Sequence, residues 1–183
     1  MASEQINVRV AGTCVMDVRI GPVPLTEPLR AQVIRRVDSP EESVGGVLGN
    51  VGIQLARLGL AVSAASHIGG DTWGQTIRRQ LTDAGIDTQK LTSLPGVASG
   101  VAFCLVEPEG DRVFLTSPGP HRQLDARWLT QTMADLKAGD VLVLAYYSRL
   151  KAMEAGLADA LADLADRGAV SYTHLTLPTT SRV

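Results

Sequence analysis

The stretch from Ser43 to Gly74 constrains the fold of this chain more than any other, because glycines divide it into short units. Apolar residues recur at three- and four-residue spacing in its first unit, which predicts one face of a helix. That face comprises Leu48, Val51, Leu55 and Leu58. Gly59 ends the predicted helix, and Ala61–Ile68 is typical of a buried strand. The turn Gly69-Gly70-Asp71 then leads into a second helix, so the stretch is interpreted as helix, strand and helix in succession.

A glycine pair, Gly45-Gly46, stands directly ahead of the first of these helices. Glycines leave the backbone N–H groups of a helix N-terminus accessible to a polar ligand. Asn50 follows one turn later, and its amide adds a donor and an acceptor on the same side. Spacing alone favours the alternative interpretation, which is a flexible N-cap followed by a satisfied surface Asn50.

An apolar run from Val8 to Met16, with Gly12 inside it, predicts a buried first strand that ends in Asp17. Ligands of open α/β sheets gather at the carboxyl ends of the strands. Asp17 is therefore placed to accept hydrogen bonds from a ligand. A turn-forming Asp17 is the alternative, and the sequence by itself leaves both open.

The remaining elements follow from periodicity and from Gly and Pro positions. Predicted strands cover Gln32–Val37, Gln89–Leu94, Ser99–Val106, Arg112–Thr116 and Val141–Ala145. The third and fourth of these form a hairpin, because the residues between them are polar and include Gly110. Helical patterns cover Trp73–Ala84, Leu124–Leu136 and Leu150–Leu164. Tyr146-Tyr147 follow a strand at the ligand edge and are expected to be half-buried with their hydroxyls in water.

Composition limits the classes of binding partner and the cellular compartment that we expect for the protein. A net charge of −2 with scattered basic residues gives no electrostatic reason to expect nucleic acid or membrane as a partner. Cys14 and Cys104 lie in apolar runs and are interpreted as reduced core thiols, so a cytoplasmic protein is expected. The three histidines, His67, His121 and His174, have no partners at metal-ligand spacing, so no metal site is expected.

The glycine pair, Asn50, the run Leu55–Gly59 and the turn Gly70–Gly74 together resemble the N-terminal signature of the pfkB (ribokinase-like) family of carbohydrate kinases. One position departs from the family pattern, since Gly70 stands where an Asp is common. The resemblance extends from about residue 6 to about residue 169. It implies a ribokinase-like three-layer α/β/α fold, with a mostly parallel sheet and a small β-sheet lid formed by residues of about 18–44 and 97–118.

The resemblance also implies a set of ligands and of residues that bind them. The expected substrate-binding residues are Asp17, Gly45, Gly46, Asn50 and Ala102, with Ser99 and Gly100 also near the substrate. The expected ligands are a small sugar or nucleoside, ATP and Mg²⁺, and a homodimer through the lid is a further expectation. Val15 and Val47 stand where ribokinases proper carry Asn and Lys, and Tyr146 stands roughly where they carry an acidic residue. These departures argue against ribose and leave fructose-type sugars, sugar acids and nucleosides open.

The family's catalytic machinery is not found in this sequence. In pfkB kinases the base and the anion hole come from a later Gly-Ala-Gly-Asp motif, in a C-terminal half that also binds ATP, and no such motif occurs here. A Walker A loop is excluded because the chain has no Gly-Lys dipeptide. We therefore expect residues 1–169 to be the N-terminal part of a kinase domain truncated after its N-terminal half, with no catalytic residue and no activity of its own.

The last fourteen residues, 170–183, are interpreted separately from the rest of the chain. They begin VSYTHLTLPT, which resembles the conceptual translation of a transposon-end adaptor used in sequencing libraries. We expect a non-native tail, and we expect the strand that starts at Ala169-Val170 to stop there; a native Thr-rich tail is the alternative.

Two functions from different classes follow from these observations. The first is an ATP-dependent carbohydrate kinase of which this chain carries the sugar-binding part. The second is a sugar- or nucleoside-binding regulatory protein of the same fold without catalysis. A third candidate is an unrelated dinucleotide-binding enzyme. It is weaker, because the glycines at 45, 46, 49 and 52 do not fit G-x-G-x-x-G.

Overall fold

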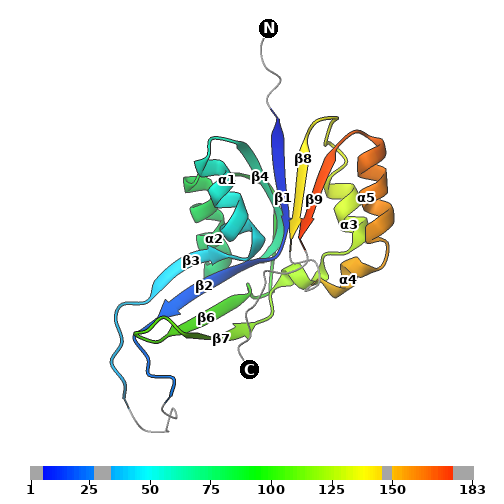
Figure 1. Ribbon diagram of the computed structural model, residues 1–183. Coiled ribbons are helices and arrows are strands. Elements are labelled where there is room, and N and C mark those ends of the chain that lie inside the picture. Colours follow the sequence, from blue (N-terminus) through cyan, green and yellow to red (C-terminus); the bar gives the residue numbers. More distant parts are fainter. Residues whose placement is uncertain (1–5, 27–33, 146–149, 175–183) are drawn as a thin grey trace.

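A computed structural model of the chain describes residues 6–26, 34–145 and 150–174, and its centre is a five-stranded parallel sheet (Figure 1). The strand order is β5-β4-β1-β8-β9, and each neighbouring pair runs in the same direction. The strands are β1 (Asn7–Gly12), β4 (Ala61–Gly69), β5 (Asp87–Leu94), β8 (Val141–Ala145) and β9 (Val170–His174). The expected α/β fold with a mostly parallel sheet is confirmed.

Helices cover both faces of this sheet and complete the three layers (Figure 1). One face carries α1 (Ile53–Arg57) and α2 (Thr72–Asp83); the other carries α3 (Ala126–Thr132), α4 (Lys151–Glu154) and α5 (Leu157–Asp166). Side chains alternate along β8, so that Val143 packs in the core with Leu81 of α2, whereas Leu142 and Leu144 pack in the core with Leu129 of α3. None of the helices in the described ranges is long and apolar enough to cross a membrane.

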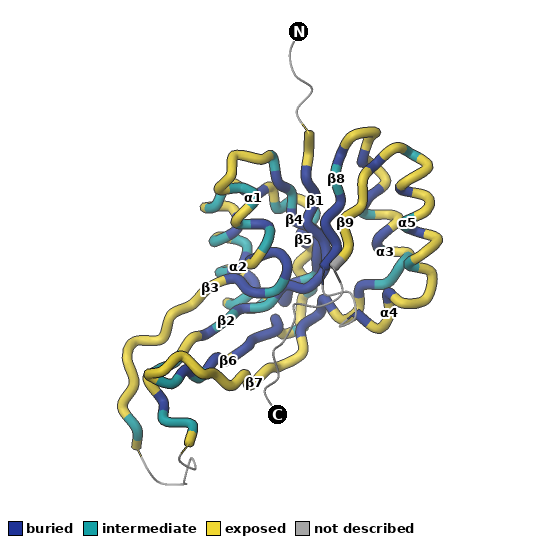
Figure 2. The backbone as a smooth tube through the Cα atoms, viewed as in Figure 1, coloured by how far each residue is buried: buried dark blue, intermediate teal, exposed yellow. Residues whose placement is uncertain are grey.

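A smaller four-stranded sheet, the lid, continues from the carboxyl end of the main sheet (Figure 1). Its strands, in the spatial order β3-β2-β6-β7, are β3 (Glu41–Gly45), β2 (Cys14–Ile20), β6 (Val101–Val106) and β7 (Arg112–Ser117). Met16, Val18, Val44 and Val101 of the lid join the core cluster of the main sheet, whereas every residue of β7 is exposed (Figure 2). The lid is therefore buried on one face and open on the other.

The strand expected from Val8 to Met16 is wrong, because the chain leaves the main sheet at Gly12. Gly12 has a φ of 126°, which side-chain-bearing residues rarely adopt, and Cys14 already begins β2. Asp17 consequently lies within a lid strand and not at the carboxyl end of β1. The glycine that the periodicity treated as part of one strand separates the two sheets.

The helix after the glycine pair buries Leu48 and packs Val51 and Leu55 against the core, as expected, but it leaves Leu58 outside the core. Its first turn is a π-helix, Leu48–Gly52, which leads directly into α1. The helix α1 ends at Arg57, so Leu58 is its C-cap residue and does not belong to the helical face. Leu58 was expected on the buried face, and its side chain is instead 78% exposed. Gly59 ends the helix with a φ of 85°, as expected.

Two further elements differ from the sequence expectations. The strand expected at Gln32–Val37 is not found at residues 34–37, and pairing begins instead at Glu41, directly after Pro40. Proline has no N–H to donate to a neighbouring strand, which explains this start. The helix expected from Leu150 to Leu164 is divided into α4 and α5 at Gly156, whose φ is 85°.

The last strand continues beyond the point where the sequence expectation ended it. We expected pairing to stop at Val170, but β9 runs to His174 and pairs with β8 in parallel register from Val141↔Val170 to Ala145↔His174. Ser171, Tyr172 and Thr173 are compatible with this, since Tyr and Thr are residues that favour strands. Residues 175–183 and Tyr146-Tyr147 lie outside the described residues.

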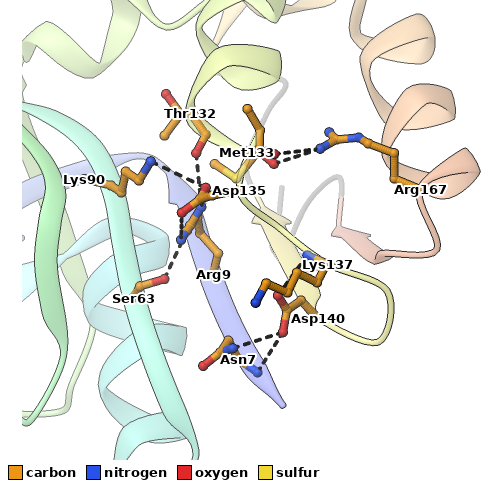
Figure 3. A network of polar contacts seen from close by, with 11 residues as sticks. Asn7, Arg9, Ser63, Lys90, Thr132, Met133, Asp135, Lys137, Asp140 and Arg167 are labelled. Carbon is orange, nitrogen blue, oxygen red and sulfur yellow. Dashed lines mark hydrogen bonds and ion pairs between the residues drawn. The ribbon is translucent and has the colours of Figure 1, made fainter. Parts of the chain in front are cut away.

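A polar network ties the amino ends of the strands to the loop after α3 (Figure 3). The Arg9 guanidinium, on β1, donates to both carboxylate oxygens of Asp135 at 2.6 and 3.2 Å, and its Nε donates to Ser63 Oγ at 3.1 Å. Lys90 of β5 approaches the same carboxylate at 3.4 Å. Because Arg9 is buried, these partners satisfy a charge that would otherwise be costly to enclose.

We expect Asp135→Asn to lower the free energy of unfolding by about 1–2 kcal/mol at neutral pH, less than for a fully buried ion pair because Asp135 is half-exposed. Hydrogen bonds from Arg9 lower the pKa of Asp135 from 3.8 to about 2. A lowered pKa means that the charged form stabilises the fold above the unfolded value of 3.8, and that this contribution disappears as the pH falls towards 2. Urea unfolding at a series of pH values tests this.

The matched control for that experiment is Asp111→Asn, in the exposed loop between β6 and β7. It removes the same charge from a carboxylate that makes no hydrogen bond or ion pair among the described residues. A stability difference between the two variants that stayed constant from pH 7 to about pH 2 would contradict the role given to Asp135.

Candidate functional site

A cavity of about 620 Å³ lies where the lid meets the carboxyl end of the main sheet. The lid contributes residues of β2, β6 and β7, and the rest of the wall comes from Thr13, Gly46 and Asn50 on one side and from the loop after β7 and α4 on the other. The lining residues are Thr13, Val15, Asp17, Gly46, Asn50, Val101, Ala102, Phe114, Thr116, Ser117, Pro118, His121, Arg122 and Lys151. Four of the five residues expected to bind substrate are thus brought together: Asp17, Gly46, Asn50 and Ala102.

Asp17 is the carboxylate of this cavity. In β2 it pairs with Ser43 of β3 on one side and with Ala102 of β6 on the other, so both neighbouring strands fix its position. Burial raises the pKa of Asp17 above its usual value of 3.8. Its side chain makes no hydrogen bond or ion pair within the described residues, which leaves both carboxylate oxygens available to accept from a ligand.

Gly45 is the expected site residue that does not line the cavity. It lies in β3 opposite Val15, and a side chain there would overlap the Asp17 carboxylate, because a Cβ atom would come closer than 3.0 Å to Cγ and to both oxygens. The first glycine of the pair therefore makes room for Asp17. Gly45 therefore acts on the site indirectly, through the position of Asp17. The sequence analysis expected only that its backbone would be exposed to a ligand.

Gly46 has a different reason to be glycine. Its φ is 72°, and a Cβ atom there would meet the carbonyl oxygen of Thr13 closer than 3.0 Å. The turn it makes brings the next two N–H groups to Thr13: Val47 donates to Thr13 Oγ1 at 3.1 Å, and Leu48 donates to the Thr13 carbonyl at 3.5 Å. These donors of the helix N-terminus were expected to face a ligand, and that expectation is wrong because Thr13 uses them.

Asn50 is exposed and lines the cavity from the π turn that begins at Leu48. It reaches the site because Gly49, just before it, lies tightly against the backbone of Val44 in β3. With the donors at the start of this turn bound to Thr13, the amide of Asn50 is the polar group that the turn offers to the cavity.

Of the three residues expected near the substrate around β6, only Ala102 lines the cavity. Ser99 is buried and holds Asp71 in place, since its hydroxyl donates to Asp71 Oδ1 at 2.6 Å and its N–H donates to Oδ2 at 2.8 Å. Asp71 in turn caps α2 by accepting from the Gly74 N–H at 2.9 Å. Gly100 packs against Gly119 and does not line the cavity. Ser99 and Gly100 therefore support the loops that surround the site.

Three polar residues of the cavity were not singled out from the sequence as site residues. His121 is buried in its wall, and its Nδ1 has no hydrogen-bond partner. Burial lowers the pKa of His121, opposed by a hydrogen bond with the Cys14 backbone, so the imidazole is neutral at pH 7. Arg122 and Lys151 are exposed at the cavity. The only sign of these two residues in the sequence was their position. Arg122 follows the strand β7, and Lys151 follows the carboxyl end of β8.

A second cavity, of about 330 Å³, lies along α2 and is lined in part by Arg78, Arg79 and Ser93. It contains none of the expected site residues, and Arg78 there donates to the backbone of Thr88 at 2.9 Å. No group of three or more His, Cys, Asp or Glu side chains with metal-binding geometry occurs among the residues that the structure describes. The larger cavity is therefore the candidate functional site.

We expect Gly45→Ala to lower ligand affinity at the larger cavity about tenfold, equivalent to about 1.4 kcal/mol, with little change in the unfolding temperature. The added methyl group would displace the Asp17 carboxylate, and a short side chain rotates at small cost where backbone atoms would not. Isothermal titration calorimetry and thermal unfolding measure the two effects. Ser43→Ala, an exposed position in the same strand, is the control and should change neither.

Comparisons with known proteins agree on one family. The sequence profile described as "pfkB family carbohydrate kinase" matches residues 6–180. An uncharacterized sugar kinase of Escherichia coli is 30% identical over 125 residues, which cover 68% of this chain and 37% of that protein. The chain therefore spans well under two thirds of the length of this relative.

Solved structures resemble the chain in fold. The crystal structure of a candidate ribokinase II from Escherichia coli, in complex with ATP and Mg²⁺, has a TM-score of 0.70 and 18% identity, covering 94% of this chain and 53% of that one. The crystal structure of fructokinase from Vibrio cholerae, with fructose, ADP and a calcium ion bound, has a TM-score of 0.68 and 17% identity, covering 93% and 51%. Both similarities confirm the ribokinase-like arrangement of sheet and lid.

Proposed function

We propose, from the premise that this chain belongs to the pfkB family of carbohydrate kinases, that it carries the sugar-binding part of an ATP-dependent kinase. The full-length gene product would transfer a phosphoryl group from ATP to a hydroxyl group of a sugar or a sugar-like molecule. Residues 1–169 would form the substrate-binding part of its kinase domain.

The observation that carries this proposal is the position of Asp17 in the cavity. A carboxylate that has no partner in the described protein, and whose pKa is raised by burial, is costly for the fold alone. A ligand with adjacent hydroxyl groups would supply the missing donors. Asn50 and the Gly46 backbone lie on the same cavity wall, which supports a polyhydroxylated ligand over an apolar one.

The residues of this cavity account for one part of the reaction. Phosphoryl transfer requires an acceptor hydroxyl held in line, a group that takes its proton, and donors that stabilise the charge on the transferring group. Asp17 and Asn50 would orient the acceptor by hydrogen bonds. We assign no catalytic base in this chain, and ATP with Mg²⁺ would be bound by residues of the full-length product that match the family's later motifs.

The test is an ADP-release assay on the full-length gene product with ATP, Mg²⁺ and a panel of sugars, sugar acids and nucleosides. We expect ADP release that depends on one class of acceptor, together with calorimetric binding of that acceptor in the absence of ATP. Binding without ADP release would support the alternative, a sugar- or nucleoside-binding regulatory protein of the same fold. Absence of binding by any member of the panel would refute the sugar-binding function of the cavity.

Two positions bear on the choice of substrate. Val15 lines the cavity, so an apolar side chain faces the ligand where ribokinases proper carry Asn, whereas Val47 is fully buried and has no access to it. This supports an acceptor other than ribose.

We also propose that the protein forms a homodimer through the lid. Phe103 of β6 and Val113 and Leu115 of β7 share one face of the lid and leave 39–55% of their area exposed, which supports burial against a second copy. Sedimentation of the same full-length preparation measures the oligomeric state, and a monomer at all concentrations would refute this proposal.

A further inference from the structure

The cavity has walls of opposite charge. Asp17 lies on the wall formed by the lid strands, together with the π turn that carries Asn50. Arg122 and Lys151 lie on the wall formed by the 3₁₀ turn η2 (Pro120–Gln123) and by α4, two elements that pack against each other. The cavity therefore contains more positive than negative charge, although the whole chain has a net charge of −2.

Neither cation has a partner among the residues that the structure describes. Arg122 and Lys151 form no ion pair and no side-chain hydrogen bond within the described part of the chain. By contrast, Arg9, Arg78 and Arg167 all bond to side-chain or backbone oxygens. Exposed cations are often merely solvated, so their lack of partners would mean little without a second observation.

The second observation is a buried imidazole in η2, on the same wall of the cavity. His121, adjacent to Arg122, lines the cavity with only 7% of its surface exposed, and its Nδ1 is buried without a partner. A protein that binds only a neutral sugar has no need for two cations on a wall that also contains a desolvated imidazole. An anionic ligand group at this wall would neutralise excess positive charge and accept charge-assisted hydrogen bonds.

We propose that the acceptor bound in this cavity is a monosaccharide with an anionic group, which Arg122 and Lys151 hold while its hydroxyl groups donate to Asp17. A cavity of about 620 Å³ has room for such a molecule across both walls. This inference rests on the proposed kinase function and names its substrate class. A carboxylate and a phosphate share the required chemistry, so the experiment separates sugar acids from sugar phosphates.

Isothermal titration calorimetry on the full-length gene product tests the inference without relying on turnover. The ligands are aldonic and ketoaldonic acids, monosaccharide phosphates, the neutral parent sugar of each, and ATP alone. We expect at least one anionic sugar to bind about tenfold or more tightly than its neutral parent. Raising NaCl from about 0.05 to about 0.5 M should weaken that binding, because salt screens exposed charges.

The double variant Arg122→Gln/Lys151→Gln should lose about tenfold or more in affinity for the anionic sugar and remain unchanged towards neutral sugars. The matched control is Arg57→Gln, which removes an exposed cation at the end of α1, outside the cavity. Thermal unfolding verifies that all variants are folded.

The outcomes separate the two proposals. Neutral sugars that bind as tightly as their acids and are phosphorylated would overturn this inference and leave the kinase function intact. Loss of ATP affinity instead of sugar affinity in the double variant would assign the two cations to the nucleotide and overturn it as well. If no sugar of either class binds, the kinase proposal and this inference both fail.

Discussion

Asp17→Asn in the full-length gene product is expected to weaken acceptor binding about 100-fold or more. Asparagine keeps the shape of the side chain but removes the charge, and each hydrogen bond to a charged group contributes roughly 1.5–3 kcal/mol. Two sugar hydroxyls that donate to the carboxylate would account for about 3 kcal/mol, which is about 100-fold in the dissociation constant. Titration calorimetry with the acceptor identified in the ADP-release assay measures the effect.

Stability provides the internal control for this prediction. The pKa of Asp17 is raised by burial, so the folded protein prefers the protonated form and its charged form at pH 7 destabilises the fold. Removing the charge should therefore leave the unfolding temperature unchanged or raise it. An Asp17→Asn variant that unfolds earlier and binds normally would mean that the carboxylate has a structural function and that the site is elsewhere.

Gly49→Ala is expected to prevent stable folding, with a loss of more than about 4 kcal/mol in the free energy of unfolding. A Cβ atom on Gly49 would lie far closer than 3.0 Å to the carbonyl carbon and oxygen of Val44. Both are backbone atoms of β3, so no side-chain rotation relieves the overlap, and the π turn would have to separate from the lid. Urea unfolding followed by circular dichroism measures this.

Gly52→Ala is the matched control within the same π turn. Gly52 has a helical φ of −57°, and the nearest atom to an added Cβ would be Ile86 Cδ1 at 3.6 Å. Alanine there should be neutral or should stabilise by about 0.5–1 kcal/mol, because it loses less backbone entropy than glycine. Equal stability of the two variants would show that the contact between Gly49 and Val44 does not constrain the fold.

The sequence was sufficient to predict the helices and strands whose hydrophobic periodicity agrees with their burial in the fold. In α2 the expected face includes Ile77 and Leu81, and both are fully buried. The expected strands Ala61–Ile68 and Val141–Ala145 correspond to β4 and β8. Helix α2 packs against the main sheet, and β4 and β8 are interior strands of it, so local pattern and tertiary burial give the same result.

Prediction failed where a single residue redirects the chain. Nothing local distinguishes Gly12, which ends β1, from a glycine inside a strand, so Asp17 was assigned to the wrong sheet. The donors of Val47 and Leu48 were assigned to a ligand because their acceptor, Thr13, lies 34 positions away from Val47 in sequence.

The candidate site itself was predicted in part. The family signature gave Asp17, Gly46, Asn50 and Ala102, which line one cavity. Arg122 and Lys151 complete its opposite wall only because the folded chain brings η2 and α4 together. Contacts of this kind depend on packing between distant segments, and no spacing rule along the chain reports them.

Arg9, in the amino half of β1, and Thr13, which follows the carboxyl end of β1 and lines the cavity, are four positions apart, which is about 13 Å along an extended chain. Substitutions at such a separation with no shared partner usually have additive effects on stability. The Arg9 network can therefore be used to raise the stability of the fold during directed evolution. Mutations that strengthen it would compensate for destabilising changes in the cavity, and the acceptor specificity could diverge without loss of the fold.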